Sequence, residues 1–265
     1  ESPLVVKPFI RSMTESELMA VMTVGMATIS GGVLAAYAGM MAPFYPAAAG
    51  HLIAASVMSA PAAFVIAKLL VPETGKPETL GVLGVEVQGE KPDVNVIDAA
   101  ARGAAEGLKL ALVVGAMLIA FIALVALANG VVGWAGSLAG FDGLSIEGML
   151  GWVLAPVAWL LGVTWVDAGV IGQLIGVDFV LNEFVAFGQL QGLLQGGAEL
   201  QERSVVIGIY ALATFANFGS VAMTIAGLGE IAPSRRQDLA RLGMKAMLAG
   251  LLAALLTATF AGMLT

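Results

Sequence analysis

The stretch Ser204–Gly229, SVVIGIYALATFANFGSVAMTIAGLG, decides the fold, because it runs for 26 residues without a charged side chain. An apolar run of this length is typical of a membrane-spanning helix. Asn217, Gly219 and Ser220 interrupt its centre, where lipid offers no partner to freed backbone groups, so buried protein or a water-filled cavity must satisfy them. The stretch therefore predicts a helix that is broken inside the bilayer, and such a break is a candidate solute-binding site.

The composition of the whole chain also indicates a helical membrane protein. Of 265 residues, 59% are hydrophobic and 12% are charged, against about 25% charged residues in a soluble domain. The apolar runs are unbroken rather than alternating, which favours helices over a β-barrel. The chain has no cysteine, which excludes disulfides and thiolate sites. Its net charge of −7 gives no basic surface for nucleic acid.

Further segments of the chain are predicted to cross the membrane or to lie beside it. Thr14–Glu17 predicts a helix start, with acidic residues in the first turn. Pro72–Val94 is polar and predicts an extramembrane linker, and Asn95–Gly107 predicts a helix that lies along the membrane surface. The windows long enough for one crossing are Leu18–Met41, Ala47–Ala67, Leu110–Val132, Ser204–Gly229 and Ala246–Thr265.

The region Gly148–Leu194 is apolar but unsuited to simple spans. Asp167, Asp178 and Glu183 divide it into short pieces, and a carboxylate that faces lipid costs several kcal/mol. These pieces predict re-entrant or buried segments; the alternative is a pair of ordinary spans with awkward charges. If the region enters and leaves on the outer side, only Arg203 among the lysine and arginine residues lies outside, and this charge distribution favours the re-entrant interpretation.

The chain contains a weak internal repeat at an offset of 186 residues. Ala27-Thr28 coincides with Ala213-Thr214, and the glycine-containing Ser30–Val33 falls near Asn217–Val221. The charge distribution makes the two long helices run in opposite directions. This pattern predicts the inverted-topology repeat of many secondary transporters; chance matching of glycine-rich membrane helices is the alternative.

Several motifs, in order along the whole chain, resemble the concentrative nucleoside transporters. They are Glu1-Ser2-Pro3-Leu4 with Lys7-Pro8 (after the tip of the first hairpin), His51–Pro61 (the fifth helix), Asn95–Lys109 (the inner surface helix), Val180–Ala186 (the second hairpin), and Glu202–Ser204 with Phe215–Ser220 (the seventh helix). The resemblance implies a homotrimer in the lipid bilayer, in which a transport domain of two hairpins and two broken helices moves solute by an elevator motion against a scaffold.

The resemblance also implies a division of the chain. The expected fold is an all-α membrane protein, an inverted-repeat secondary transporter with re-entrant helical hairpins and broken transmembrane helices. Because Glu1 resembles the interior of the family's proteins, the chain is expected to be the C-terminal part of a longer one. The expected parts are the first repeat of the transport domain (1–71), an inner-side linker (72–94), a surface helix (95–109), a scaffold helix (110–132) and the second repeat (133–265).

Glu183, at a predicted hairpin tip, is the first candidate for solute binding. A carboxylate offers several acceptor positions for paired hydroxyls, and no basic residue lies nearby in sequence. The resemblance implies that Glu183 binds the ribose of a nucleoside. The alternative is a buried carboxylate that is paired for structure alone.

The broken helix supplies three more candidates. Asn217 donates and accepts at once, Ser220 does so on a smaller scale, and Gly219 lets the chain unwind between them. The resemblance implies that both polar side chains contact ribose and that Phe215 lies beside the nucleoside. Hydrogen bonds between membrane helices are the alternative for Asn217 and Ser220, and plain packing is the alternative for Phe215.

The first half of the chain supplies the remaining candidates. Glu1 resembles the glutamate that reaches the nucleobase, and Val33 resembles an apolar contact to the base, with helix packing as its alternative. Thr28 and Ile29 resemble positions that give a side-chain oxygen and a backbone carbonyl to sodium, and oxygen ligands suit a hard cation. A threonine in a helix also often bonds back to the preceding turn, so proton coupling stays open beside sodium.

These features predict an ion-coupled nucleoside importer that crosses the cell membrane several times and needs no cofactor beyond its coupling ion. The alternatives are a proton-coupled symporter, a passive channel and a membrane sensor that binds nucleosides without transporting them. An enzyme is not expected. The chain has one histidine, so it holds no His-Glu-x-x-His metal motif.

Overall fold

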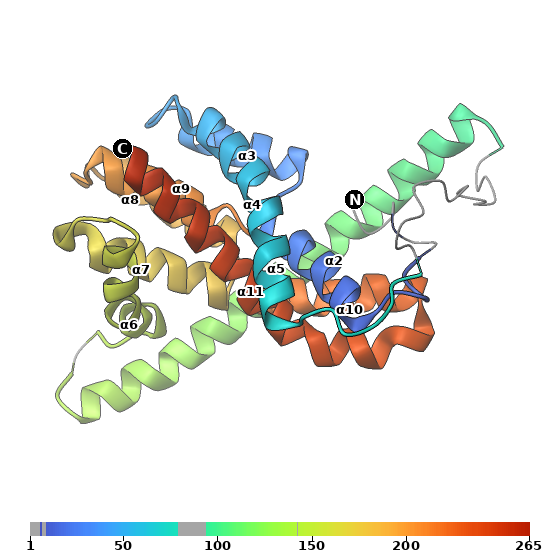
Figure 1. The fold of residues 1–265 in the computed structure, drawn as a ribbon. Helices are drawn as coiled ribbons and strands as arrows, with labels where there is room; N and C mark the ends of the chain where they lie inside the picture. The colour runs from blue at the N-terminus through green and yellow to red at the C-terminus, as the bar shows by residue number, and fades with distance from the viewer. Residues whose placement is uncertain (1–5, 7–8, 79–93, 142) are drawn as a thin grey trace.

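The computed structural model describes residues 6, 9–78, 94–141 and 143–265, and these residues form helices and connecting loops without a strand (Figure 1). The predicted all-α fold is confirmed over this part of the chain. The elements are α2 (Glu15–Ala27), α3 (Gly31–Met41), α4 (Ala48–Leu70), α5 (Val96–Leu138), α6 (Ile146–Leu160), α7 (Trp165–Val180), α8 (Glu183–Gln195), α9 (Glu202–Leu212), α10 (Phe218–Ile231), the 3₁₀ turn η1 (Pro233–Arg235) and α11 (Arg236–Leu264).

Three stretches of the described chain are long and apolar enough to cross a membrane: Glu15–Met41, Ala48–Leu70 and Pro233–Leu264. They contain the window predicted at Leu18–Met41 and all but the last residue of the window predicted at Ala246–Thr265, and α4 overlaps the window at Ala47–Ala67. Many large apolar side chains are exposed on the surface; the exposed fraction is 87% for Trp152 and 85% for Val166. Such a surface suits contact with lipid rather than with water.

Both predicted broken helices are present. The first window is divided into α2 and α3 at Thr28–Ser30, and the second repeat is divided into α9 and α10 at Ala213–Asn217. The second break lies earlier than predicted, because Gly219 and Ser220 belong to the first turn of α10 and the chain does not unwind between Asn217 and Ser220. Asn217 begins α10 because its side-chain Oδ1 accepts the backbone N–H of Ser220 at 2.9 Å, which satisfies one of the donors that a helix start leaves unpaired.

The region with three carboxylates folds as short helices, in agreement with the re-entrant prediction. The axes of α6 and α7 are bent by 118° across the connection at 161–164. The chain reverses again at Leu181–Asn182 before α8, and the Asn182 side chain caps that helix by accepting the N–H of Val185 at 2.9 Å. Glu183 therefore lies at a helix tip, as predicted.

The long helix α5 differs from the prediction. A surface helix over 95–109 and a separate scaffold helix over 110–132 were expected, whereas Val96–Leu138 is one uninterrupted helix that protrudes beyond the others on both sides (Figure 1). Asn95 caps it by accepting the N–H of Asp98 at 2.9 Å. The polar first part is rich in alanine and contains no proline, so nothing in it ends the helix before the apolar part begins.

Packing gathers the helices around α11 and around the hairpin, that is, the re-entrant unit formed by α6, α7 and α8. α11 packs against α2, α4, α9 and α10, and Gly250 passes close to both helix breaks. A Cβ atom at Gly250 would lie 3.2 Å from the Cβ of Met26 and 3.3 Å from that of Ala216. The absence of a side chain at this position lets α11 hold the two breaks together.

A second close approach lies inside the hairpin. α6 and α7 pack along their lengths, and a Cβ atom at Gly172 would lie 2.7 Å from the backbone nitrogen of Ala155. Glycine is therefore required for this helix spacing, as in many helix pairs of membrane proteins.

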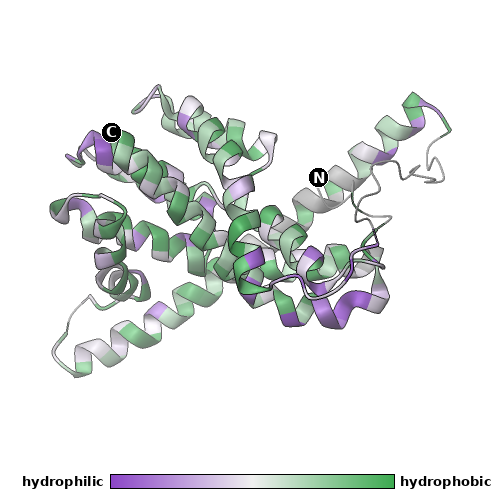
Figure 2. Cartoon of the chain, in the orientation of Figure 1, coloured by the Kyte–Doolittle hydropathy of each residue, from purple (hydrophilic) through white to green (hydrophobic). Residues whose placement is uncertain are grey.

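Hydrophilic residues gather at the beginnings of α2 and α11, whereas most of the helical surface is apolar (Figure 2). Thr14 caps α2 in a reciprocal capping box with Glu17, which confirms the predicted helix start. The Thr14 hydroxyl also donates to Glu73 at 2.8 Å, and this bond, followed by the N–H of Gly75 and the charge of Lys68, holds the pKa of Glu73 below its usual value. The start of α2 is thus tied to the chain that leaves α4.

Candidate solute-binding site

Glu183 is buried at the N-terminus of α8 and accepts a hydrogen bond on each carboxylate oxygen. The Nδ2 group of Asn217 donates to Oε2 at 2.9 Å, and the hydroxyl of Tyr37 donates to Oε1 at 3.1 Å. Its position in the first turn of a helix also favours a negative charge. Two donors and a helix N-terminus make Glu183 a stabilised acceptor in an apolar surrounding.

Asn217 and Ser220 complete the polar cluster at the beginning of α10. Asn217 Oδ1 accepts the backbone N–H of Ser220 at 2.9 Å and the Ser220 hydroxyl at 3.1 Å. These bonds fix the amide so that its nitrogen points to Glu183. The structure therefore brings together the three polar residues that the sequence analysis selected, and both Asn217 and Ser220 are buried. Their role in binding a solute stays a prediction.

Tyr37 is a site residue that the sequence analysis did not select. Its ring stacks on that of Phe187 with 4.4 Å between centroids and an interplanar angle of 17°, which directs the hydroxyl to Glu183. The signal was present, since Tyr37 follows the candidate Val33 by four positions and i, i+4 residues share a helix face.

The two helix breaks are joined directly by hydrogen bonds. The carbonyl oxygen of Met26, in the last turn of α2, accepts the backbone N–H of Phe215 at 2.7 Å and the Thr214 hydroxyl at 2.9 Å. The last four carbonyls of a helix lack partners within it, and here the break of the other repeat supplies two donors to one of them, the carbonyl of Met26. The two halves of the predicted inverted repeat therefore meet at their interruptions.

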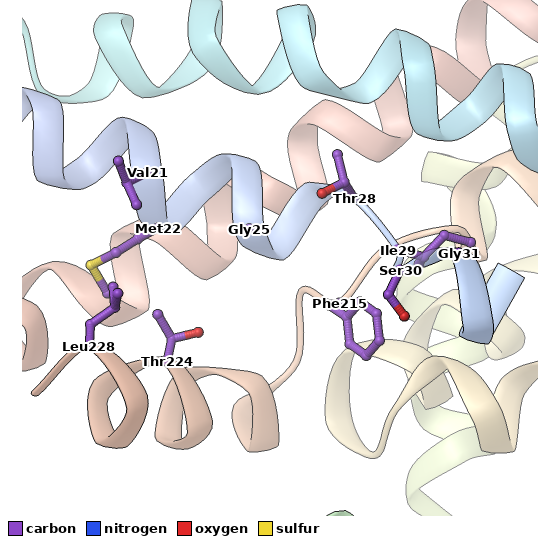
Figure 3. Close-up of a pocket in the computed structure, with 10 residues that line it drawn as sticks. All are labelled: Val21, Met22, Gly25, Thr28, Ile29, Ser30, Gly31, Phe215, Thr224 and Leu228. Carbon is purple, nitrogen blue, oxygen red and sulfur yellow. The ribbon is translucent and has the colours of Figure 1, made fainter. Parts of the chain in front are cut away.

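A cavity of about 360 Å³ opens beside these breaks (Figure 3). Thr28 and Ile29, the candidate sodium ligands, line it together with Phe215 and Thr224. The Thr28 hydroxyl donates to the carbonyl of Val24 at 2.8 Å, which is the local bond that the sequence analysis named as an alternative. A hydroxyl that donates its hydrogen still keeps oxygen lone pairs for a cation, so hydroxyl and carbonyl oxygens at this break fit a hard ion such as Na⁺.

The remaining candidates fall in three places. Phe215 lies within the second break, beside Ser30 of the first (Figure 3). Val33 is half-buried on α3 and packs against the main core cluster, as its packing alternative anticipated. Glu1 lies outside the described residues.

Comparison with known proteins identifies relatives of this chain. Residues 51–262 match the model of the family described as "Na+ dependent nucleoside transporter C-terminus". The chain is 47% identical to the uncharacterized transporter YutK of Bacillus subtilis over 99% of this chain and 63% of that protein. It is 45% identical to the nucleoside permease NupC of Helicobacter pylori over 99% of this chain and 61% of the permease.

A mammalian relative and solved structures show the same similarity. The chain is 38% identical to sodium/nucleoside cotransporter 1 of Rattus norvegicus, covering 100% of this chain and 42% of the cotransporter. A structure of CNTnw in an inward-facing, substrate-bound state matches with a TM-score of 0.86 and 46% identity over 98% of this chain and 60% of that one. An outward-facing variant of CNTnw matches with a TM-score of 0.87, at 46% identity over 99% of this chain and 61% of that one.

These comparisons bear on the class of protein and on its location. The relatives named by activity are transporters and permeases, not enzymes, which agrees with the sequence analysis. The chain is that of an integral membrane protein, and three stretches of its described part are long and apolar enough to cross a membrane. It spans about 60% of the length of the bacterial relatives that it matches.

Proposed function

Because the chain belongs to the Na⁺-dependent nucleoside transporter family, we propose that the full-length protein imports nucleosides across the cell membrane in symport with Na⁺. The observation that carries the proposal is the cluster of Glu183, Asn217 and Ser220 at the break between α9 and α10, which is hydrogen-bonded to the end of α2 at the other break. A transporter with inverted repeats is expected to bind its solute at such a point.

In the proposed binding mode, the ribose of the nucleoside docks on this cluster. Two neighbouring ribose hydroxyls donate to the Glu183 carboxylate, while the amide of Asn217 and the hydroxyl of Ser220 donate to or accept from the sugar oxygens. The bond that now joins Asn217 to Glu183 keeps both groups satisfied until the solute replaces it. Phe215 offers an apolar ring near the nucleobase, and Glu1 and Val33 are further candidates for contacts to the base.

Sodium is proposed to bind at the first break, where Thr28 gives its hydroxyl oxygen and Ile29 its backbone carbonyl. The Met26 carbonyl links this break to the non-helical segment before Asn217, through Thr214 and Phe215. An ion that orders one break therefore also favours the arrangement of the other. By linkage, each of the two ligands then binds better when the other is present.

An elevator motion and a homotrimer complete the proposal. The hairpin and the broken helices form a packed unit around α11, whereas among the described residues α5 packs chiefly on α6. Large apolar side chains on α5 are exposed, among them Leu112 at 66% and Ile119 at 74%. This surface supports a role for α5 as a scaffold against lipid and neighbouring protomers, along which the packed unit slides.

The experiment is uptake of radiolabelled uridine by cells that lack their own nucleoside uptake and express the full-length protein. Accumulation above the external concentration, abolished when the sodium gradient is collapsed, is the expected result. Accumulation that follows a proton gradient alone would assign the proton-coupled alternative. Equilibration without accumulation would assign a passive channel, and binding without uptake would assign a sensor.

A further inference from the structure

Asp178, in the last turn of α7, is a fully buried carboxylate without a hydrogen-bond partner. Among the described residues, neither of its side-chain oxygens is paired. The other buried carboxylates of this part are satisfied: Glu183 accepts two hydrogen bonds, and Asp167 accepts the hydroxyl of Thr164 and the N–H of Gln201, each at 3.1 Å. An unpaired ionisable group in a membrane helix calls for an explanation by function.

Two titratable groups interact electrostatically with Asp178. Glu183 follows it by five positions across the hairpin tip, and Tyr37 of α3 is near enough to both carboxylates to interact with their charges. The hydroxyl of Tyr37 is already donated to Glu183. Asp178 therefore lies beside a carboxylate and receives no hydrogen bond in return.

The other titratable groups on α7 and on the helices packed against it have contacts of their own. Arg203 is the one cation on α6 to α9, and its guanidinium donates to the carbonyl of Gly162, roughly 20 Å along the helix from Asp178. The remaining groups and their contacts are Asp167 with Thr164, Glu147 with Asn129, Glu202 with Tyr45, and Tyr210 with the ring of His51. None of these described groups neutralises Asp178.

The hydrogen bonds decide which of the two carboxylates carries the negative charge. Glu183 accepts a donor on each oxygen, which favours the ionised form. A second ionised carboxylate beside it, buried and unpaired, is strongly unfavourable, whereas a protonated acid is neutral. The pair is therefore expected to hold one charge and one proton, with the proton on Asp178.

We infer that Asp178 is a proton-binding site of the closed hairpin, and that its proton is taken up together with the nucleoside that binds at Glu183. This inference rests on the proposed function. When the hairpin opens, water reaches Asp178 and the proton leaves. When the hairpin closes over a solute, the proton returns, because the closed site tolerates only one negative charge.

A proton fits this site better than a metal ion does. Sodium requires several oxygen ligands around it, whereas Asp178 is fully buried and neither of its side-chain oxygens has a hydrogen-bond partner among the described residues. The cavity beside Thr28 is lined by residues of both breaks and not by Asp178. A proton needs only the Asp178 carboxylate itself.

The first test reads the proton without using nucleoside binding. Infrared spectra of the purified full-length protein are recorded at neutral pH for the wild type, Asp178→Asn and the matched control Asp167→Asn. The expected result is a protonated-carboxyl C=O band that Asp178→Asn removes and Asp167→Asn keeps. A spectrum in which Asp178→Asn leaves this band intact, or in which the wild type lacks it, overturns the inference. Size-exclusion profiles identify any variant that fails to fold, and Asp178→Glu, which keeps an acid at the position, is then expected to retain a band.

The second test measures whether the proton and the nucleoside bind together. Uridine binding is followed by calorimetry in two buffers of different ionisation enthalpy, and the wild type is expected to take up close to one proton where the open form is ionised. In that pH range the affinity of the wild type for uridine falls about tenfold for each unit by which the pH rises. The affinity of Asp178→Asn, which cannot ionise at this position, is expected to change less than about twofold per pH unit. Binding by the wild type without proton uptake overturns this inference and leaves the proposed function standing. Absence of uridine binding, with the infrared band present, refutes the proposed function instead.

Discussion

The Nδ2 group of Asn217 donates to Oε2 of Glu183 across 2.9 Å and so joins the first residue of α8 to the residue that caps α10. Each of these two helix tips is capped by an asparagine, Asn182 in one and Asn217 in the other. The bond is buried, where it is stronger than in water and where losing either partner is costly.

Replacing Glu183 with Gln is expected to weaken nucleoside affinity by about 10- to 100-fold, because hydrogen bonds to a charged group contribute about 1.5–3 kcal/mol. The measurement is uridine uptake, with KM and membrane abundance determined together. The matched control is Glu147→Gln on α6, where the carboxylate accepts from the side chain of Asn129. Unchanged uridine affinity in Glu183→Gln would refute the assigned role.

Two substitutions of Asn217 separate its contact to Glu183 from its function as a helix cap. Asn217→Ser keeps an N-cap oxygen but is too short to reach Glu183, whereas Asn217→Ala loses both interactions. Both variants are expected to lose about tenfold in uridine affinity and to lose the stability that the buried bond to Glu183 contributes, and Asn217→Ala is expected to lose about 1 kcal/mol more than Asn217→Ser because it also lacks the cap. Thermal unfolding in detergent and uridine binding give the two numbers. Equal stability of the two variants would contradict the capping role.

Removing the hydroxyl of Tyr37 tests the second donor to Glu183. Tyr37→Phe keeps the ring stacked on Phe187, so the expected loss is one hydrogen bond, about 1–2 kcal/mol or about 5- to 30-fold in uridine affinity. Tyr45→Phe, whose hydroxyl lies at the exposed Glu202, is the control and is expected to bind normally. A Tyr37→Phe protein that binds uridine as tightly as the wild type would remove Tyr37 from the site.

Thr28→Val is expected to raise the sodium concentration for half-maximal uptake by about tenfold, since it removes one neutral oxygen ligand worth about 1–1.5 kcal/mol. Thr28→Ser keeps the hydroxyl and is expected to retain sodium affinity. Thr259→Val on α11 is the control, because Thr259 makes the same bond to a carbonyl four residues earlier. If both valine variants respond alike, the Thr28 hydroxyl serves only the helix.

Gly172→Ala is expected to destabilise the hairpin by about 1–3 kcal/mol, because its Cβ would lie 2.7 Å from the backbone nitrogen of Ala155, which is closer than van der Waals contact allows. Gly169→Ala on the same helix meets open space, so its expected effect is neutral or a gain of up to about 1 kcal/mol. Thermal unfolding in detergent compares the two. A Gly172→Ala protein as stable as Gly169→Ala would show that α6 and α7 do not depend on this close approach.

Much of the fold could be predicted from local patterns. Charge-free length predicted α4 and α11, the capping box predicted the beginning of α2, and the polar residues of Ser204–Gly229 predicted a break. These are signals of short range, so a single sequence carries them. The continuity of α5 was missed because a change from polar to apolar composition does not end a helix when no residue in it breaks the backbone.

The candidate site could be predicted only in part. Glu183, Asn217 and Ser220 are conspicuous because polar residues are costly in lipid. Tyr37 was overlooked, since one tyrosine in an apolar helix resembles packing until its partner is placed 146 positions away. The missing partners of Asp178 were likewise invisible, because whether a carboxylate is satisfied depends on the neighbours that tertiary structure brings to it.

The carbonyl oxygen of Met26 receives both the N–H of Phe215 and the hydroxyl of Thr214. One atom thus joins segments that lie almost two hundred positions apart, so straightening either interruption would break both of these hydrogen bonds. A conformational change at one interruption is therefore expected to be accompanied by a change at the other.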